Sequence, residues 1–141
     1  MATLNPYLNY PGNAEQAFNF YKSVFGGDFK DFVRFKDTPE KDKLKPAEQE
    51  KIMHVSLPIG NGNVLMGTDA LESMGHKITS GNNFYLSIEA QSKEEAEKLF
   101  KGLSAGGKVV MPLADTFWGA YFGMFNDKFG VQWMINYTKP K

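Results

Sequence analysis

Residues 9–29, NYPGNAEQAFNFYKSVFGGDF, decide the fold, because they hold a helix start, an apolar stripe and a helix end. Asn13 is the predicted N-cap, since its side-chain oxygen can accept a hydrogen bond from a backbone N–H of the first turn. Gly26 and Gly27 follow the helix, and glycine enters the left-handed conformation that closes a helix without steric cost. The apolar residues recur at spacings of three, four and seven, which is typical of a helix that packs on a sheet. They are Ala14, Ala17, Phe18, Tyr21, Val24 and Phe25.

The same signals return in residues 92–107, SKEEAEKLFKGLSAGG, where a capping Ser92 precedes a helical pattern and a glycine pair. An offset of 79 positions aligns the two helices. It places Glu15, Ala17, Phe20, Tyr21 and Lys22 on Glu94, Ala96, Leu99, Phe100 and Lys101. We therefore predict that the chain consists of two copies of one module.

Stretches with period-two alternation of apolar and polar residues surround each predicted helix and indicate strands. In the first module they are residues 3–10, 29–35, 51–59 and 63–68. In the second they are residues 83–90, 108–113, 120–126 and 131–137. Each module therefore has the order βαβββ, and the predicted fold class is α+β. We expect a single domain over residues 1–141, with module one at about 1–70, a linker at 71–81 and module two at about 82–141.

The composition excludes several classes of function. Sixteen basic and sixteen acidic residues give a net charge of zero, whereas a nucleic-acid-binding protein needs a concentrated positive face. The absence of cysteine excludes disulfides, thiolate nucleophiles and zinc–thiolate sites. We expect no signal peptide and no membrane segment, because no sufficiently long apolar run occurs. The expected location is cytoplasmic.

Strand alternation predicts which side chains line a ligand cavity. One face of the strands packs under the helices, with Met53, Leu86 and Trp133 among its members. The opposite face is predicted to contribute Leu8, Tyr10, His54, Ser56, Asn83, Tyr85, Ser87, Gln132, Met134 and Asn136. Apolar and aromatic groups with neutral hydrogen-bonding atoms suit a neutral or weakly polar small molecule. The alternative is that these residues fill a core between the modules.

Two further groups are candidates for chemistry. His54 can act as a general base or orient a ligand, because imidazole titrates near neutral pH. It can equally be a hydrogen-bonded histidine without a catalytic role, and His76 in the linker is expected to be exposed. The stretch DTFWGAYF, residues 115–122, contains Trp118, Tyr121 and Phe122, which can form a stacking wall for a planar ligand or pack against a neighbouring module or subunit. Asp115 is the carboxylate nearest to this wall.

Three stretches resemble the vicinal-oxygen-chelate superfamily, which includes glyoxalase I, bleomycin-resistance proteins and extradiol dioxygenases. They are NPYLNYPGNAEQAFNFYKSVFGG near the start, LMGTD at 65–69 and DKFGVQWMINY at 127–137, and they are most similar to the PhnB-like branch. The resemblance implies that the two modules form a curled mixed sheet with a central cleft. It also implies a homodimer.

Metal-using members of this superfamily have four ligand positions, which the resemblance places on Pro6, His54, Asn83 and Met134. Only the imidazole of His54 is a good ligand, because proline offers no donor, asparagine is a weak one and thioether sulfur is too soft for the ions used. We therefore expect no metal site of the family type and no cofactor.

The first hypothesis is a PhnB-like, metal-free homodimer that binds an unidentified small molecule, with neither nucleic acid nor membrane as a partner. The alternative is a metal-dependent lyase or dioxygenase that uses His54, with reserve ligands Glu50, Glu72, Glu89 or His76. A third possibility is a drug-sequestering resistance protein, which zero net charge disfavours for a cationic drug. Relatives of this branch are often labelled as methyltransferases for a ubiquinone precursor. No glycine-rich loop after a strand is present to hold S-adenosylmethionine, so that activity is not expected.

Overall fold

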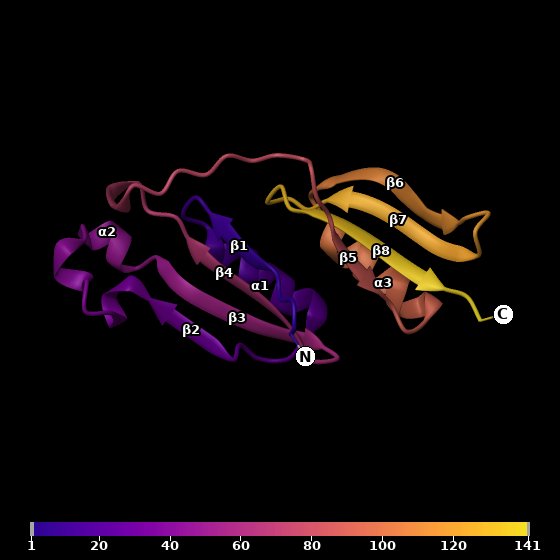
Figure 1. Cartoon of the computed structure of the whole chain (residues 1–141), viewed down its shortest axis with the longest axis horizontal. Helices are drawn as coiled ribbons and strands as arrows, with labels where there is room; N and C mark the ends of the chain where they lie inside the picture. Colours follow the sequence, from indigo (N-terminus) through magenta and orange to yellow (C-terminus); the bar gives the residue numbers. More distant parts are fainter. Residues whose placement is uncertain (1, 141) are drawn as a thin grey trace. The chain divides into compact units, whose positions relative to one another are not determined.

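A computed structural model describes residues 2–140. The chain divides into two compact units, the first ending at Thr79 and the second beginning at Ser80, so the boundary falls within the predicted linker. Each unit has its own four-stranded sheet, as Figure 1 shows. The units are called unit 1 and unit 2 below.

Unit 1 contains one long helix and four strands. They are β1 (Tyr7–Tyr10), α1 (Ala14–Phe25), β2 (Asp31–Arg34), β3 (Ile52–Gly60) and β4 (Asn63–Asp69). The strand order is β1-β4-β3-β2, with β1 parallel to β4 and the other pairs antiparallel. Short helices lie in the segment between β2 and β3 and in the linker after β4. They are η1 (Phe35–Asp37), η2 (Lys41–Lys43), α2 (Pro46–Gln49) and η3 (Glu72–Met74).

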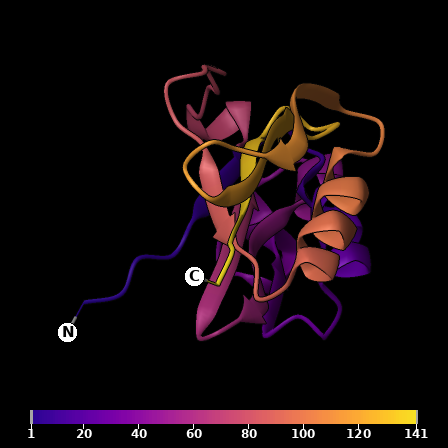
Figure 2. The ribbon, with the colours of Figure 1, turned by 90° about the vertical axis from the view of Figure 1, so that its right-hand side faces the viewer.

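Unit 2 repeats this arrangement. Its elements are β5 (Leu86–Glu89), α3 (Lys93–Ser104), β6 (Lys108–Asp115), β7 (Ala120–Asn126) and β8 (Gln132–Thr138), in the strand order β5-β8-β7-β6. Figure 2 shows α3 lying along one face of this sheet. The predicted α+β class and the two βαβββ modules are confirmed. No helix within residues 2–140 is long and apolar enough to span a membrane.

A glycine in each sheet lets the helix approach closely. A Cβ atom added at Gly67 in β4 would lie 2.5 Å from the ring of Phe18 in α1. A Cβ atom added at Gly123 in β7 would lie 2.5 Å from the ring of Phe100 in α3. Because successive residues of a strand point to opposite faces, these two contacts identify the helix-covered face of each sheet. The face turned away from the unit's own helix is called the outer face below.

The start of α1 is not capped as the sequence predicted. The Asn13 side chain makes no capping hydrogen bond. Instead, the backbone N–H of Ala14 donates to Asp69 Oδ1 at 2.9 Å, and the N–H of Ile52 donates to Asp69 Oδ2 at 2.8 Å. Asp69 is only 2% exposed. One buried carboxylate at the end of β4 therefore joins the start of α1 to the start of β3.

The predicted cap of α3 is confirmed, since the N–H of Glu95 donates to Ser92 Oγ at 3.0 Å. Gly26 and Gly27 after α1 have the positive φ that glycine permits, 80° and 75°, but the ψ of −170° at Gly26 is not that of the predicted left-handed helical conformation. In the hairpin between β7 and β8, Asp127 Oδ1 accepts hydrogen bonds from the N–H groups of Phe129 and Val131.

We expect Asp69→Asn to lower the free energy of unfolding by about 2–3 kcal/mol, because the amide keeps one oxygen for two buried N–H donors and loses the charge. Urea denaturation monitored by circular dichroism measures the loss. Asp28→Asn is the control, because the Asp28 side chain is 94% exposed. A change of less than about 0.5 kcal/mol for Asp69→Asn, comparable to an ordinary surface substitution, would show that this carboxylate is not a structural tie.

Candidate functional site

The outer face of the unit 1 sheet holds an aromatic pair. Because Gly67 faces α1, its neighbours Met66 and Thr68 lie on the outer face. Tyr7 stacks on His54 there, with ring centroids 5.8 Å apart and an interplanar angle of 25°. His54 therefore lies on the face where the sequence predicted it, half-buried beneath a tyrosine ring.

Ser56 lies on the same face but its hydroxyl is already engaged. Ser56 Oγ accepts a hydrogen bond from the Asp31 N–H at 3.1 Å and donates to Asp31 Oδ2 at 3.1 Å. The residue is 1% exposed. Its polar group thus joins β3 to β2 and offers little to a ligand.

Leu8 and Tyr10 face α1, so their predicted place on the ligand-facing side is wrong. Leu8 lies opposite Gly67 in the β1–β4 pairing, and both residues are buried, at 8% and 2% exposed. The hydroxyl oxygens of Tyr10 and Tyr21 lie 2.8 Å apart, so the phenol of Tyr10 has a partner inside the core. The physical reason is burial: Leu8 and Tyr10 are the apolar alternates of β1, and hydrophobic burial directs them under the helix.

The outer face of unit 2 is organised in cross-strand rows. Gly123 and Phe125 contact Phe100 of α3, so the residues between and beside them, Phe122, Met124 and Asn126, point to the outer face. Their cross-strand partners in β8 are Asn136, Met134 and Gln132. The methionine row comprises Met134, Met124 and Met111, which are paired in register across β8, β7 and β6. Gln132 and Met134 are therefore on the predicted face.

Trp118 and Tyr121 do not form one wall. The Tyr121 hydroxyl donates to Glu97 Oε1 of α3 at 3.2 Å, and Lys93 Nζ lies 4.9 Å from its ring centroid, so Tyr121 faces the helix. Burial, together with the carboxylate of Glu97, raises the pKa of Tyr121. Trp118 instead contacts Phe122, with centroids 5.9 Å apart, and is 56% exposed. The aromatic wall on the outer face consists of Trp118 and Phe122.

The remaining predicted polar residues of unit 2 have other positions. Asn83 and Tyr85 precede β5, which begins at Leu86, so the predicted strand at 83–90 starts too early. Gln132 is 7% exposed and its side-chain amide donates to the carbonyl oxygen of Phe84. Asp115 forms an exposed ion pair with Lys139 at 2.5 Å, which lowers the pKa of that carboxyl.

Sequence reasoning did not single out Met111, Met124 and Asn126 as lining residues. Met124 and Asn126 alternate with Gly123 and Phe125 in β7, AYFGMFN, so strand alternation was the signal that placed them opposite the helix face. Asn126 Oδ1 is buried and has no hydrogen-bond partner.

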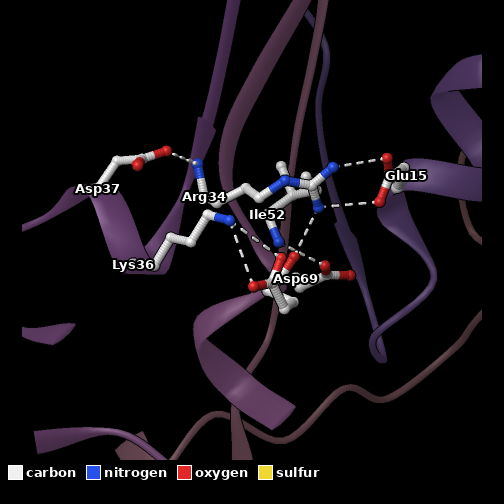
Figure 3. A network of polar contacts seen from close by, with 7 residues as sticks. Glu15, Arg34, Lys36, Asp37, Ile52 and Asp69 are labelled. Atoms are coloured by element: carbon white, nitrogen blue, oxygen red, sulfur yellow. Dashed lines mark hydrogen bonds and ion pairs between the residues drawn. The ribbon is translucent and has the colours of Figure 1, made fainter. Parts of the chain in front are cut away.

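Figure 3 shows a polar network at the start of α1, also unanticipated. Arg34 donates to both oxygens of Glu15, at 2.9 and 2.7 Å, and to the carbonyl oxygen of Glu50 at 2.7 Å. These residues line a polar hollow of about 580 Å³ together with Lys51 and Asp69. Lys51 Nζ donates to the Gly12 carbonyl oxygen at 2.8 Å. Both cations are thus already bound, and the network ties β2 to α1.

Comparison with known proteins decides the family. The family model described as "Glyoxalase/Bleomycin resistance protein/Dioxygenase superfamily" matches residues 3–135 of this chain. The chain belongs to this superfamily. YjdN of Escherichia coli is 34% identical to this chain over an alignment of 147 positions. The alignment covers 98% of this chain and 97% of YjdN.

Two solved structures support the assignment. The structure of PA1353 from Pseudomonas aeruginosa is 38% identical, with a TM-score of 0.85 over 99% of this chain and all of that chain. The PhnB protein from Bacillus cereus is 27% identical, with a TM-score of 0.76 over 96% of this chain and 99% of that chain. The predicted likeness to PhnB proteins is confirmed by this neighbour.

The superfamily implies a metal site, and the residues present do not fit one. Within residues 2–140, no three His, Asp or Glu side chains lie close enough to hold an ion. His54 is stacked on Tyr7 and paired across the strands with Val33. Two of the three reserve carboxylates are engaged, since Glu50 pairs with Lys36 at 3.3 Å and Glu89 accepts from Asn136 Nδ2 at 2.8 Å. We therefore derive no catalytic step through a metal.

The Glu15–Arg34 pair predicts a pH dependence of stability. The hydrogen bonds from Arg34 lower the pKa of Glu15 below 4.5, so the ionised carboxylate stabilises the fold above that pH, and this stabilisation is lost as the pH falls through the lower, folded value. We expect Glu15→Gln to reduce the free energy of unfolding at pH 7 by about 0.5–1 kcal/mol, a modest amount because both side chains are partly exposed.

At about pH 3 the difference between wild type and Glu15→Gln should be smaller than at pH 7, because the wild-type carboxyl gains a proton as the pH falls through its lowered pKa. Urea denaturation at both pH values measures it. Glu94→Gln, on the exposed side of α3, is the control and should change little at either pH. An equal loss at pH 7 and pH 3 would contradict the role of the charge.

Proposed function

We propose that this member of the superfamily is a metal-free protein that binds a neutral or weakly polar small molecule. The observation that carries the proposal is the chemistry of the unit 2 outer face. It presents the Trp118–Phe122 aromatic pair and the methionine row, beside the neutral amides of β7 and β8. Apolar and aromatic groups with a few polar atoms among them are the usual lining of an organic-ligand site.

Glu89 of β5 lies on this face and accepts hydrogen bonds from its neighbours. Glu89 Oε1 accepts from Asn136 Nδ2 at 2.8 Å and from Thr138 Oγ1 at 3.2 Å. Glu89 Oε2 accepts from the Thr138 N–H at 3.0 Å. All three donors are uncharged groups of β8, so they orient the carboxylate within the sheet.

The Tyr7–His54 pair of unit 1 supports the same chemistry. A half-buried imidazole stacked on a phenol provides an aromatic surface with one polar edge, suited to orienting a weakly polar molecule. We assign His54 to ligand orientation rather than to metal binding. On this proposal the lyase or dioxygenase alternative is set aside, since no group of three His, Asp or Glu side chains within residues 2–140 could hold an ion.

We also propose that the protein is a homodimer. Several large apolar side chains of unit 2 are exposed: Phe84, Val109, Val110, Met111, Phe117 and Trp118. Three of them are consecutive in β6, which lies at the edge of its sheet. Exposed apolar edge strands favour association, and zero net charge leaves little electrostatic repulsion between copies.

Native mass spectrometry of protein purified without chelator or affinity tag tests the metal-free and dimeric states together. We expect twice the 15.8 kDa chain mass, with no added metal. A parallel thermal melt with zinc, manganese, iron or nickel should show no stabilisation, because an ion that bound the native state would raise the melting temperature. A near-stoichiometric metal mass, or a clear rise with one ion, would revive the metal-dependent lyase or dioxygenase.

A further inference from the structure

The starting point is the turn between β3 and β4, Gly60–Asn61–Gly62. All three residues are exposed, and their φ values are 109°, 52° and 77°. Asn61 is the only residue other than glycine within residues 2–140 that has a positive φ. Asparagine enters this left-handed region more readily than most residues, because its short polar side chain can hydrogen-bond locally. The turn therefore places an exposed side-chain amide directly before a glycine.

This order of residues allows a reaction within the chain. A bond between the Cγ atom of an asparagine and the backbone nitrogen of the next residue closes a five-membered ring. A side chain on that next residue crowds the approach and restricts the backbone rotation that it requires, whereas glycine does neither. In the sequence, Asn61 is the only asparagine that a glycine follows.

The nitrogen that must attack is not held by the turn. Within residues 2–140, the Gly62 N–H donates to none of the backbone acceptors of turns and loops. A Cβ atom added at Gly60 or at Gly62 would meet nothing within 4 Å apart from the adjoining residues. This open space leaves room for the backbone to rotate and lets water reach the turn.

Asn63, two positions further along, provides a comparison in the same hairpin. It is also exposed, but the residue after it is the β-branched Val64 of β4. The Val64 N–H donates to Asn5 Oδ1 at 3.1 Å, so the nitrogen that would attack the Asn63 side chain is engaged. Asn61 and Asn63 therefore differ in the attacking nitrogen, although both side chains are exposed.

We propose that Asn61 is a site of spontaneous modification, at which the chain converts its own asparagine to isoaspartate and aspartate. The Gly62 nitrogen bonds to Asn61 Cγ, the Cγ–Nδ2 bond breaks, and the side-chain nitrogen leaves as ammonia with the proton from Gly62. The product is a cyclic succinimide, which has two carbonyl carbons. Water adds to one of them and breaks its bond to the Gly62 nitrogen, so that opening at Cγ gives aspartate and opening at the backbone carbonyl gives isoaspartate.

Both products change the hairpin. Each adds one negative charge to a chain whose net charge is zero. Isoaspartate also lengthens the backbone of the turn by one methylene group, next to the paired residues Gly60 and Asn63. The turn fixes the register of a hairpin, so a longer turn should loosen the adjoining ends of β3 and β4. The bond from Val64 to Asn5 lies at this end and should weaken with it.

The test follows the intact protein during incubation in mildly alkaline buffer. Trypsin cleaves after Lys51 and Lys77, and fragmentation of the peptide 52–77 by mass spectrometry assigns each conversion of amide to acid to Asn61 or Asn63. A protein isoaspartate methyltransferase with labelled methyl donor measures isoaspartate, which forms through the succinimide and not by direct hydrolysis. We expect conversion at Asn61, with isoaspartate among the products, before any is detected at Asn63.

Two variants test the mechanism. Asn61→Gln should abolish the isoaspartate signal of this peptide, because the longer side chain would have to close a less favourable six-membered ring. Asn63→Gln is the matched control, and it should leave the rate of conversion at Asn61 unchanged. Circular dichroism of each variant confirms that it is folded.

The inference is overturned if native protein shows no conversion at Asn61, if Asn63 converts as fast, or if aspartate forms at Asn61 without isoaspartate. Conversion in urea-denatured protein alone would show that the native turn holds Asn61 Cγ away from the Gly62 nitrogen. Anion-exchange chromatography separates the converted protein by its added charge. Hydrogen–deuterium exchange at Val64 should then be faster than in unconverted protein, and equal exchange would refute the loosening of the hairpin.

Discussion

Unit 1 depends on one buried carboxylate. Asp69 is separated by 55 positions from Ala14 and by 17 from Ile52, and it accepts the first free N–H of α1 and the first N–H of β3 at once. This fixes where α1 starts, and with it the contact between Phe18 and Gly67. That contact decides which face of the sheet the helix covers. The aromatic pair on the outer face follows from it.

Unit 2 has the same topology, but two residues share the role that Asp69 has in unit 1. Ser92 caps α3 locally, while Asp127 binds the turn between β7 and β8 and accepts a hydrogen bond from Trp133 Nε1 at 2.9 Å. Asp127 is 3% exposed, so its charge is held by donors rather than by solvent. The outcome is a β7–β8 hairpin whose register aligns amide with amide and methionine with methionine. Glu89 of β5 and Lys108 of β6 are paired in register with the outer-face residues Asn136 and Asn126.

The donors present do not fit the metal site of the metal-using members of the superfamily. A dication needs several anionic or imidazole donors converging on one point, and the described residues offer no such group. Polar atoms that remain, such as those of Ser56, Gln132 and Glu89, are mostly bound to neighbours within the same sheet. Recognition then depends on shape, aromatic contact and the few unfilled polar atoms.

The alternation of apolar and polar residues in strands, and the glycines at helix ends and turns, predicted most of the fold. Both signals depend only on residues that are near one another in the chain. Examples are Ser92 at the start of α3 and Gly26 after α1. Another is the turn Gly60–Asn61–Gly62 between β3 and β4, where the φ values are 109°, 52° and 77°. Asn13 failed as a cap because the competing acceptor, Asp69, lies far along the chain. Alternation separates two faces of β1 but does not say which one meets the helix.

The candidate site was less predictable, because it also depends on contacts between residues far apart in the chain. Tyr121 and Trp118 are three residues apart, yet Tyr121 lies in β7 facing α3 while Trp118 lies in the preceding turn and folds against Phe122. The methionine row required knowledge of the register between three strands, including the irregular pairing of β6 with β7. Register is a long-range property that no single segment encodes.

We propose that the outer face of unit 2 is the ligand-binding surface. Methyl NMR of protein labelled at its methionine methyl groups tests it directly, with trans-4-hydroxystilbene, a neutral and weakly polar aromatic molecule, as the added probe. We predict that the signals of Met124 and Met134 move in proportion to the fraction of protein that has bound the ligand, while those of Met53 and Met74 in unit 1 stay in place. Saturable shifts confined to unit 1, with Met124 and Met134 unmoved, would contradict it.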